Sequence, residues 1–166
     1  LCDARLLVEE IFAAATRLWA NDPHVRWRLQ APAQLPLVMA DPVRLRNVLM
    51  NLLDNAAKHT DHGQIILRAE GGEGGLYIWI EDTGCGMSAA TLLRTRRNMM
   101  HGVGGANLRS IDAEHVGLGL AMAYHVLALH SGDLQIDSEE GRGTTCRLRL
   151  PPAPEAAAAL APVNEQ

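Results

Sequence analysis

The sequence predicts an α+β fold in which one mixed sheet carries three main helices on a single face, as a two-layer sandwich. Three observations predict it. Helical periodicity and strand-like alternation follow the order helix, strand, helix, two strands, long loop, helix, two strands. Glycine-rich turns such as GGEGG separate neighbouring strand patterns. One long helical segment is apolar on one side and polar on the other, as a helix that covers a sheet must be.

Local sequence signals place each helix and strand along the chain. Residues 1–20 are expected to form the first helix, capped by Asp3, and residues 25–32 the first strand. The second helix should begin after Asp41, its N-cap, with Pro42 at the first helical position. The remaining elements are strands at 64–70 and 76–82, an apolar helix at 118–130, and two final strands in GDLQIDS and TTCRLRL.

Two segments lack a clear pattern. Residues 83–116 are rich in Gly, Arg, Met and Asn, and a loop of this length in a compact domain is expected to be functional or mobile. The segment after Pro151 is rich in Ala and Pro and is expected to be disordered. The sequence therefore predicts one folded domain at residues 1–151 and a disordered tail at 152–166.

Composition narrows the class of protein. A length of 166 residues suits one domain, and a net charge of −4 argues against a general nucleic-acid binder or a binder of anionic membranes. Three widely spaced cysteines without CxxC argue against a disulfide framework and a zinc site, which favours a reducing cytoplasm. We find no secretory signal and no apolar run of membrane-spanning length. Because the first residue is Leu1, we expect a piece of a longer protein.

The second helix carries an unusual polar stripe. On a helical projection, five polar residues fall within an arc of about 80°. An ordinary solvated stripe would carry more Glu and Lys, whereas Asn is a weaker helix former, so a specific role is indicated. Amide oxygens suit Mg²⁺, which takes few protein ligands, and a lysine beside them can attract a phosphate. The stripe consists of Arg44, Asn47, Asn51, Asn55 and Lys58.

Three glycine motifs follow. DTGCGM (82–87) ends a strand pattern, so Asp82 can accept a hydrogen bond from an exocyclic amine such as N6 of adenine. Its glycines would let the backbone approach a ring. VGLGLAM places Gly117 and Gly119 at a helix start, where free N–H groups bind phosphates. Each motif alone, like GRGTTCRLRLP (141–151), is also compatible with an ordinary turn or tight packing.

Together, in this order, the motifs are specific. The chain resembles the catalytic ATP-binding domain of bacterial sensor histidine kinases, in the GHKL superfamily with gyrase, Hsp90 and MutL. NVLMNLLDNAAKHT is similar to the N box, DTGCGM to the G1 box, VGLGLAM to the G2 box, and GRGTTCRLRLP to the last motif. The resemblance spans about residues 1–151 and implies the Bergerat fold, with a long mobile ATP lid at about 88–116.

The resemblance implies ATP and Mg²⁺ as cofactors. Asn51, Asn55 and Lys58 match the catalytic positions, with both asparagines reaching Mg²⁺ and the phosphates. Asp82 matches the carboxylate that reads adenine N6, and Thr144 matches a threonine that helps to hold it. The implied nucleotide-binding residues are Asn51, Asn55, Lys58, His59, Asp82, Gly84, Gly86, Met87, Gly117, Leu118, Gly119, Leu120 and Thr144.

Asn51 distinguishes between branches of the superfamily. In the hydrolytic members of this superfamily and in anti-sigma serine kinases, a general-base glutamate stands four residues before the Mg²⁺ asparagine. By its resemblance to them, this chain has Asn51 at that position. No P-loop occurs either. The resemblance therefore favours a protein-histidine kinase, with an anti-sigma-type serine kinase as a weaker alternative.

The resemblance also implies partners. None of the seven histidines is directly followed by an acid, as a phosphoacceptor histidine usually is, so the acceptor should lie on a separate dimerisation hairpin of the full-length protein. A response regulator would receive the phosphoryl group, and no nucleic acid is expected. We expect a monomeric fragment, a homodimeric full-length protein and a cytoplasmic domain, and the resemblance allows an inner-membrane anchor elsewhere in the parent.

Two departures from the family pattern keep a further alternative open. His115 replaces the first glycine of the G2 box, and residues 91–114 contain no Phe, Tyr or Trp where the family carries its F box. One interpretation is a diverged lid that still closes. Another is that the lid arginines (Arg94, Arg96 and Arg97) or the paired methionines replace the aromatic anchor. A third interpretation is a catalytically impaired, nucleotide-binding regulatory module. Cys85 stands where an aliphatic residue is usual and is expected to act as a small apolar side chain.

Overall fold

A computed structural model describes residues 1–101 and 118–154. The helices are α1 (Ala4–Trp19), α2 (Pro42–Lys58), α3 (Ala89–His101) and α4 (Leu118–Leu129). The strands are β1 (Cys2–Asp3), β2 (Val25–Gln30), β3 (Leu37–Val38), β4 (Gly63–Gly72), β5 (Gly75–Asp82), β6 (Asp133–Glu139) and β7 (Gly143–Leu150).

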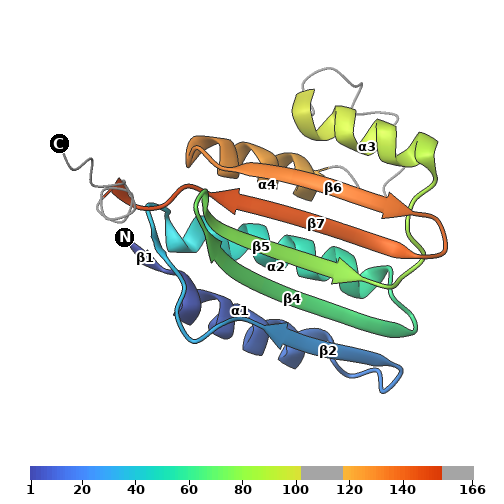
Figure 1. Ribbon diagram of the computed structural model, residues 1–166. Helices are drawn as coiled ribbons and strands as arrows, with labels where there is room; N and C mark the ends of the chain where they lie inside the picture. The colour runs from blue at the N-terminus through green and yellow to red at the C-terminus, as the bar shows by residue number, and fades with distance from the viewer. Residues whose placement is uncertain (102–117, 155–166) are drawn as a thin grey trace.

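A mixed five-stranded sheet forms one layer, in the order β2-β4-β5-β7-β6. β2 runs parallel to β4, and the other neighbours are antiparallel. Helices α1, α2 and α4 lie behind the sheet as drawn in Figure 1, while α3 lies beside the edge strand β6. The predicted two-layer α+β architecture with three main helices on one face is confirmed.

Helix α2 is the element on which the predicted polar stripe lies. The carboxylate of Asp41 accepts hydrogen bonds from the backbone N–H groups of Val43 (2.9 Å) and Arg44 (3.2 Å), and proline occupies the first turn, as predicted. The cap therefore fixes where the helix begins. Its apolar side packs into the core, and the buried residues are Leu45, Val48, Leu49, Leu52, Leu53 and Ala56.

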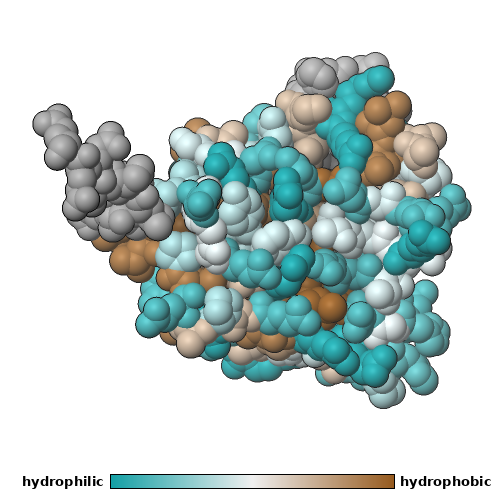
Figure 2. Space-filling view, viewed as in Figure 1, coloured by the Kyte–Doolittle hydropathy of each residue, from teal (hydrophilic) through white to brown (hydrophobic). Residues whose placement is uncertain are grey.

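The two faces of the sheet differ in character. Alternate residues such as Ile65, Leu67 and Ile80 are buried against the helices, as the period of two in a strand requires. On the opposite face, the Arg68 guanidinium lies 4.2 Å from the centre of the Trp79 ring, a cation–π contact that covers the indole. The view in Figure 2, taken from the same side as Figure 1, is largely hydrophilic with scattered apolar patches.

The N-terminal segment differs from the prediction. The predicted helix over residues 1–20 begins only at Ala4, with Asp3 as the predicted cap. Cys2 and Asp3 instead form β1, which pairs antiparallel with β3 in a separate two-stranded sheet. The pairing depends on residues about 35 positions away, so no local pattern could indicate it.

The predicted irregular loop over 83–116 was wrong for residues 89–101, which form α3. This helix is fixed by tertiary contacts. Met99 is buried, and the Arg96 guanidinium donates to the backbone oxygen of Ile136 (2.6 and 3.0 Å) and to the Asp137 carboxylate (2.8 Å) on β6. Residues 102–117, which include His115, Gly117 and the rest of the predicted lid, lie outside the described residues.

The folded domain also extends past the predicted boundary at residue 151. Pro152 forms an isolated bridge with Val38, and the Ala153 N–H donates to the Leu37 oxygen at 3.1 Å. Ala153 is 1% exposed. The predicted tail therefore starts too early by at least two residues, and residues 155–166 lie outside the described part.

In the part of the chain that the structure describes, no helix has both the length and the apolar character needed to cross a membrane.

The contacts of residues 152 and 153 give a stability test. A chain that ends at Pro151 should unfold at lower urea concentration than a chain that ends at Pro154, with a loss of about 1–2 kcal/mol, because it lacks a strand hydrogen bond and a buried methyl group. Equilibrium urea unfolding, followed by circular dichroism, measures the difference. Equal midpoints would contradict the assignment of these residues to the folded domain.

Candidate functional site

The second half of α2 carries the two predicted asparagines, and the first of them lies beside α4. Asn51 and Asn55 are partly buried and lie one helical turn apart, on the side away from the apolar residues. A Cβ atom added to Gly119, in the first turn of α4, would lie 3.8 Å from the Cβ of Asn51. The structure therefore brings Asn51 and Gly119 together, and the start of α4 faces the amide side of α2.

Lys58 lies in the last turn of α2 and is half exposed. Its ammonium group is 2.6 Å from the carboxylate of Asp54, one turn earlier. A phosphate group that bound Lys58 would therefore share the ammonium with Asp54 or displace it. His59 follows as the C-cap residue, and its backbone oxygen accepts a hydrogen bond from Cys85 N–H at 3.0 Å. The end of α2 is thus bonded directly to the DTGCGM loop.

Asp82 occupies a defined row across the sheet. It pairs in register with Thr144 on β7, which pairs with Ser138 on β6. Directly opposed residues share one face of a sheet, and so do residues two positions apart along a strand. The preceding row of Ile80, Cys146 and Ile136 is buried, so Asp82, Thr144 and Ser138 lie on the helix-covered face, at the edge of the core.

Two backbone N–H groups hold the Asp82 carboxylate. Gly84 N–H donates to Oδ1 at 2.9 Å, and Thr144 N–H donates to the same oxygen at 3.2 Å. Among the described residues, Oδ2 accepts no hydrogen bond, so it remains an acceptor for a donor on a ligand. Thr144 thus contacts Asp82 through its backbone N–H, and the predicted role of Thr144 in holding the carboxylate through water stays a prediction.

The surroundings of Asp82 are poorly solvated. Burial raises the pKa of Asp82, and the hydrogen bonds from Gly84 and Thr144 and the nearby His59 offset this only in part. Burial also raises the pKa of the neighbouring Cys146 thiol to about 12, which keeps that side chain neutral. Asp82 therefore combines a fixed orientation with a partly desolvated acceptor.

The glycines of the DTGCGM loop are required by backbone contacts. A Cβ on Gly84 would lie 2.0 Å from the backbone oxygen of His59, and a Cβ on Gly86 would lie 2.0 Å from that of Glu139. Gly86 also has a φ of +61°, which glycine adopts without strain. The DTGCGM loop therefore packs closely against both the end of α2 and the β6–β7 turn. The structural need for these glycines is contact with protein, whereas the prediction had considered a ligand ring.

Other predicted residues have varied surroundings. Met87 is partly buried against the core, and its N–H donates to Ser138 Oγ at 2.9 Å. Leu120 is 6% exposed and its side chain belongs to the core. Leu118 begins α4. Arg96, considered as a replacement for the aromatic lid anchor, instead donates a hydrogen bond to Ile136 on β6.

Two polar residues near Asp82 were missed by the sequence analysis. Ser138 bonds to three residues of the site, one in the DTGCGM loop and two at the start of β7, and nothing in GDLQIDS distinguishes it from an ordinary strand residue. Thr60 is 3% exposed, and among the described residues its hydroxyl has no hydrogen-bond partner. That hydroxyl lies beside Gly84, 2.9 Å from the position of an added Cβ. A buried hydroxyl of this kind usually meets a water or a ligand.

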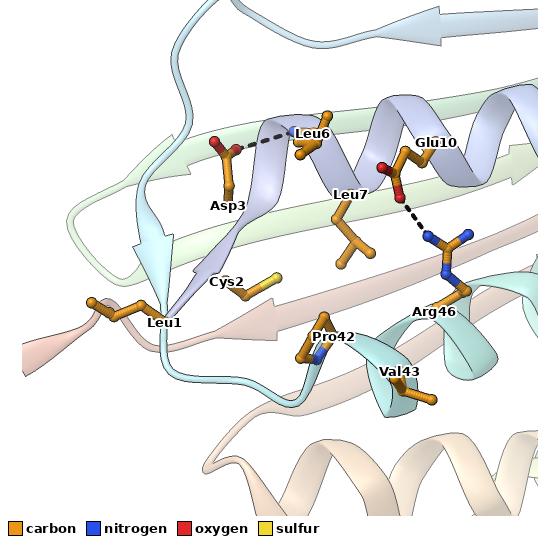
Figure 3. A pocket seen from close by; sticks show the side chains of 9 residues that line it. All are labelled: Leu1, Cys2, Asp3, Leu6, Leu7, Glu10, Pro42, Val43 and Arg46. Atoms are coloured by element: carbon orange, nitrogen blue, oxygen red, sulfur yellow. Dashed lines mark hydrogen bonds and ion pairs between the residues drawn. The ribbon is translucent and has the colours of Figure 1, made fainter.

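A separate groove lies between the starts of α1 and α2 (Figure 3). It is mostly apolar, and an ion pair between Arg46 and Glu10 borders it. No predicted site residue lines it, and about 20 Å of helix separates the start of α2 from Asn55. The groove is therefore not part of the candidate site. Its lining consists of Leu1, Cys2, Asp3, Leu6, Leu7, Glu10, Pro42, Val43 and Arg46.

Solved structures share this fold. Full-length ShkA in complex with AMPPNP superposes with a TM-score of 0.74 at 24% identity, over 92% of this chain and 30% of ShkA. A nucleotide-free catalytic domain of the histidine kinase ThkA has a TM-score of 0.74 at 18% identity, over 93% of this chain and 95% of that domain. The fold is therefore that of a histidine kinase catalytic domain.

The sequence pattern of one family matches residues 40–154, and this family is described as histidine kinase-, DNA gyrase B-, and HSP90-like ATPase. The match covers more than half of the chain and all four motifs. The chain belongs to this family.

Several sensor histidine kinases are similar to this chain in sequence. ZraS of Escherichia coli (strain K12) is 35% identical over 133 residues, which are 80% of this chain and 27% of ZraS. DivJ of Caulobacter vibrioides is 40% identical over 115 residues, 69% of this chain and 19% of DivJ. The chain thus spans about a quarter or less of these two relatives.

The raised pKa of Asp82 predicts a conflict between stability and function. Folding a charged Asp82 costs free energy, so Asp82→Asn should be more stable than the wild type at neutral pH. As pH falls through the raised folded pKa and below the ordinary value of 3.8, Asp82 is neutral in both states and the advantage should vanish.

Urea unfolding of both proteins at pH 7 and at about pH 3 measures this difference. Asp61→Asn, at an exposed position, serves as the control and should change little at either pH. A less stable Asp82→Asn protein at pH 7 would contradict the desolvation argument.

Proposed function

We propose that this chain is the ATP-binding catalytic domain of a sensor histidine kinase. The supporting observation is the placement of Asp82 on the same face of the sheet as the helix that carries Asn51 and Asn55. Its Oδ2 has no hydrogen-bond donor among the residues that the structure describes. An adenine at Asp82 and phosphates near the start of α4 would occupy the two ends of one site. Family membership and the histidine kinase relatives support the same proposal.

The residues fit ATP with Mg²⁺. Among the described residues, no three His, Cys, Asp or Glu side chains gather as a metal site. A cation here would depend on the neutral amide oxygens of Asn51 and Asn55 together with phosphate oxygens, which suits Mg²⁺. When bound, Mg²⁺ would neutralise charge on the phosphates.

The chain's own residues would position the nucleotide and stabilise the charge on its phosphates. Asp82 Oδ2 would accept a hydrogen bond from the 6-amino group of adenine, and the amides of α2 would hold the cation and the phosphates. Lys58 contributes a positive charge beside them. The first turn of α4 lies beside Asn51, so a helix N-terminus is close to the same region. Phosphoryl transfer depends mainly on such positioning and charge stabilisation.

Asn51 supports a kinase rather than a hydrolase. An amide cannot take a proton from water, so this position cannot supply the general base that a glutamate would supply. The phosphoacceptor is proposed to be a histidine on a separate dimerisation hairpin of the full-length protein, with a response regulator as the next acceptor. The isolated chain is proposed to be a monomer, and the full-length protein a homodimer with this domain in the cytoplasm.

Loss of the Mg²⁺ ligand should remove nucleotide binding. Asn55→Ala is expected to abolish measurable binding of Mg²⁺-ATP in isothermal titration calorimetry, because the amide oxygen that orients the cation is absent. Asn47→Ala is the matched control, since Asn47 lies two turns earlier on the same polar stripe and is exposed. If the affinity of Asn55→Ala stays within about twofold of the wild type, the metal assignment is wrong.

The proposed reaction predicts a particular product. The full-length protein, incubated with γ-labelled ATP, should acquire an acid-labile label that withstands base, as phosphohistidine does. Asn55→Ala in the same protein should not acquire it. An acid-stable phosphoserine on a partner would support a serine kinase instead. Binding of ATP with no transfer would support a regulatory nucleotide-binding module.

A further inference from the structure

We infer that Ser138, which does not face the adenine position directly, sets the base selectivity of the site by fixing the direction of the Thr144 hydroxyl. The inference rests on the proposed function, because it assumes that the base lies at Asp82. Ser138 Oγ lies 2.9 Å from Met87 N, 3.0 Å from the Gly143 oxygen and 2.8 Å from Thr144 Oγ1. It therefore joins the DTGCGM loop to β7.

The hydroxyl of Ser138 has one proton and two lone pairs. The Gly143 carbonyl can only accept, and the Met87 N–H can only donate. All three hydrogen bonds form together in one arrangement alone: Ser138 donates to Gly143 and accepts from Met87, so its second lone pair accepts the proton of Thr144. The Thr144 O–H is consequently directed at Ser138.

This arrangement decides what Thr144 offers to a ligand. With its proton committed to Ser138, Thr144 Oγ1 presents only lone pairs to the rest of the site. Asp82, the register neighbour of Thr144, likewise presents Oδ2 as an acceptor, because its other oxygen takes both backbone N–H groups. The edge of the site that faces the base is therefore a pair of acceptors.

A pair of acceptors distinguishes between purines at position 6. A 6-amino group has two hydrogens and can satisfy both acceptors, directly or through one water. A 6-oxo group brings further lone pairs, so the acceptors would be left unsatisfied in a partly desolvated place. If the Thr144 hydroxyl could rotate, it would donate to a 6-oxo group and much of this discrimination would disappear. Ser138 is thus a positioning residue for selectivity between 6-amino and 6-oxo purines.

The test compares ATP with inosine triphosphate, in which an oxo group replaces the 6-amino group, in the presence of Mg²⁺. Isothermal titration gives the selectivity ratio, which is the dissociation constant of inosine triphosphate divided by that of ATP. The wild type should prefer ATP by about tenfold or more. Ser138→Ala should lower this ratio by about threefold or more, the effect of one misdirected neutral hydrogen bond. Ser138→Thr, which keeps the hydroxyl, should retain the wild-type ratio.

A double-mutant cycle separates this role from a structural one. In a Thr144→Val background, Ser138→Ala should no longer change the ratio, since it acts through the Thr144 hydroxyl. Loss of affinity for both nucleotides at an unchanged ratio would overturn the inference and leave the proposed function intact. No binding of ATP by the wild type would overturn both. Should Ser138→Ala fail to fold, Ser138→Cys replaces it, because a thiol is a weak hydrogen-bonding group, with the same two outcomes.

Discussion

The packing of α2 on the sheet is the constraint on which the rest of the structure depends. Six apolar residues on one side of this helix are buried in the core, and the Asp41 cap fixes where the helix starts. Once that face is docked, the rotation of the helix about its axis is set, and Asn51 lies beside Gly119 in the first turn of α4. The position of the polar stripe is therefore a consequence of core packing.

The sheet fixes the position of Asp82. β5 and β7 are paired in a register that puts Asp82 opposite Thr144, one row beyond the buried Ile80 and Cys146. The same position orients the carboxylate and removes part of its solvent. Burial raises its pKa and makes its charge unfavourable for folding, while two backbone N–H groups keep it oriented. In the proposed function this oriented carboxylate binds the base, and a loss of stability of this kind is common at functional positions.

The sequence predicts the parts of this molecule that follow from local patterns. Asp41 and Pro42 mark the start of α2 because capping acts within one turn, and alternation reveals strands whose one face is buried. α3 could not be predicted, because Arg96 holds it to Ile136 on a strand about 40 positions away. The same is true of the pairing between Cys2 and Val38. For the site, motif order indicated Asp82 and Asn55, whereas Ser138 is recognisable only after β6 and β7 are paired.

The central claim is the location of the nucleotide site between α2, the start of α4 and the Asp82 row. Titrating Mg²⁺-ATP into the ¹⁵N-labelled chain and following its amide resonances tests it most directly. Large shifts are expected for the N–H groups of Gly84 and Thr144, which hold Asp82, and for the side-chain amides of Asn51 and Asn55. Little change is expected at Leu6 and Val43 in the groove of Figure 3. Shifts confined to that groove, with Gly84 and Thr144 unaffected, would contradict it.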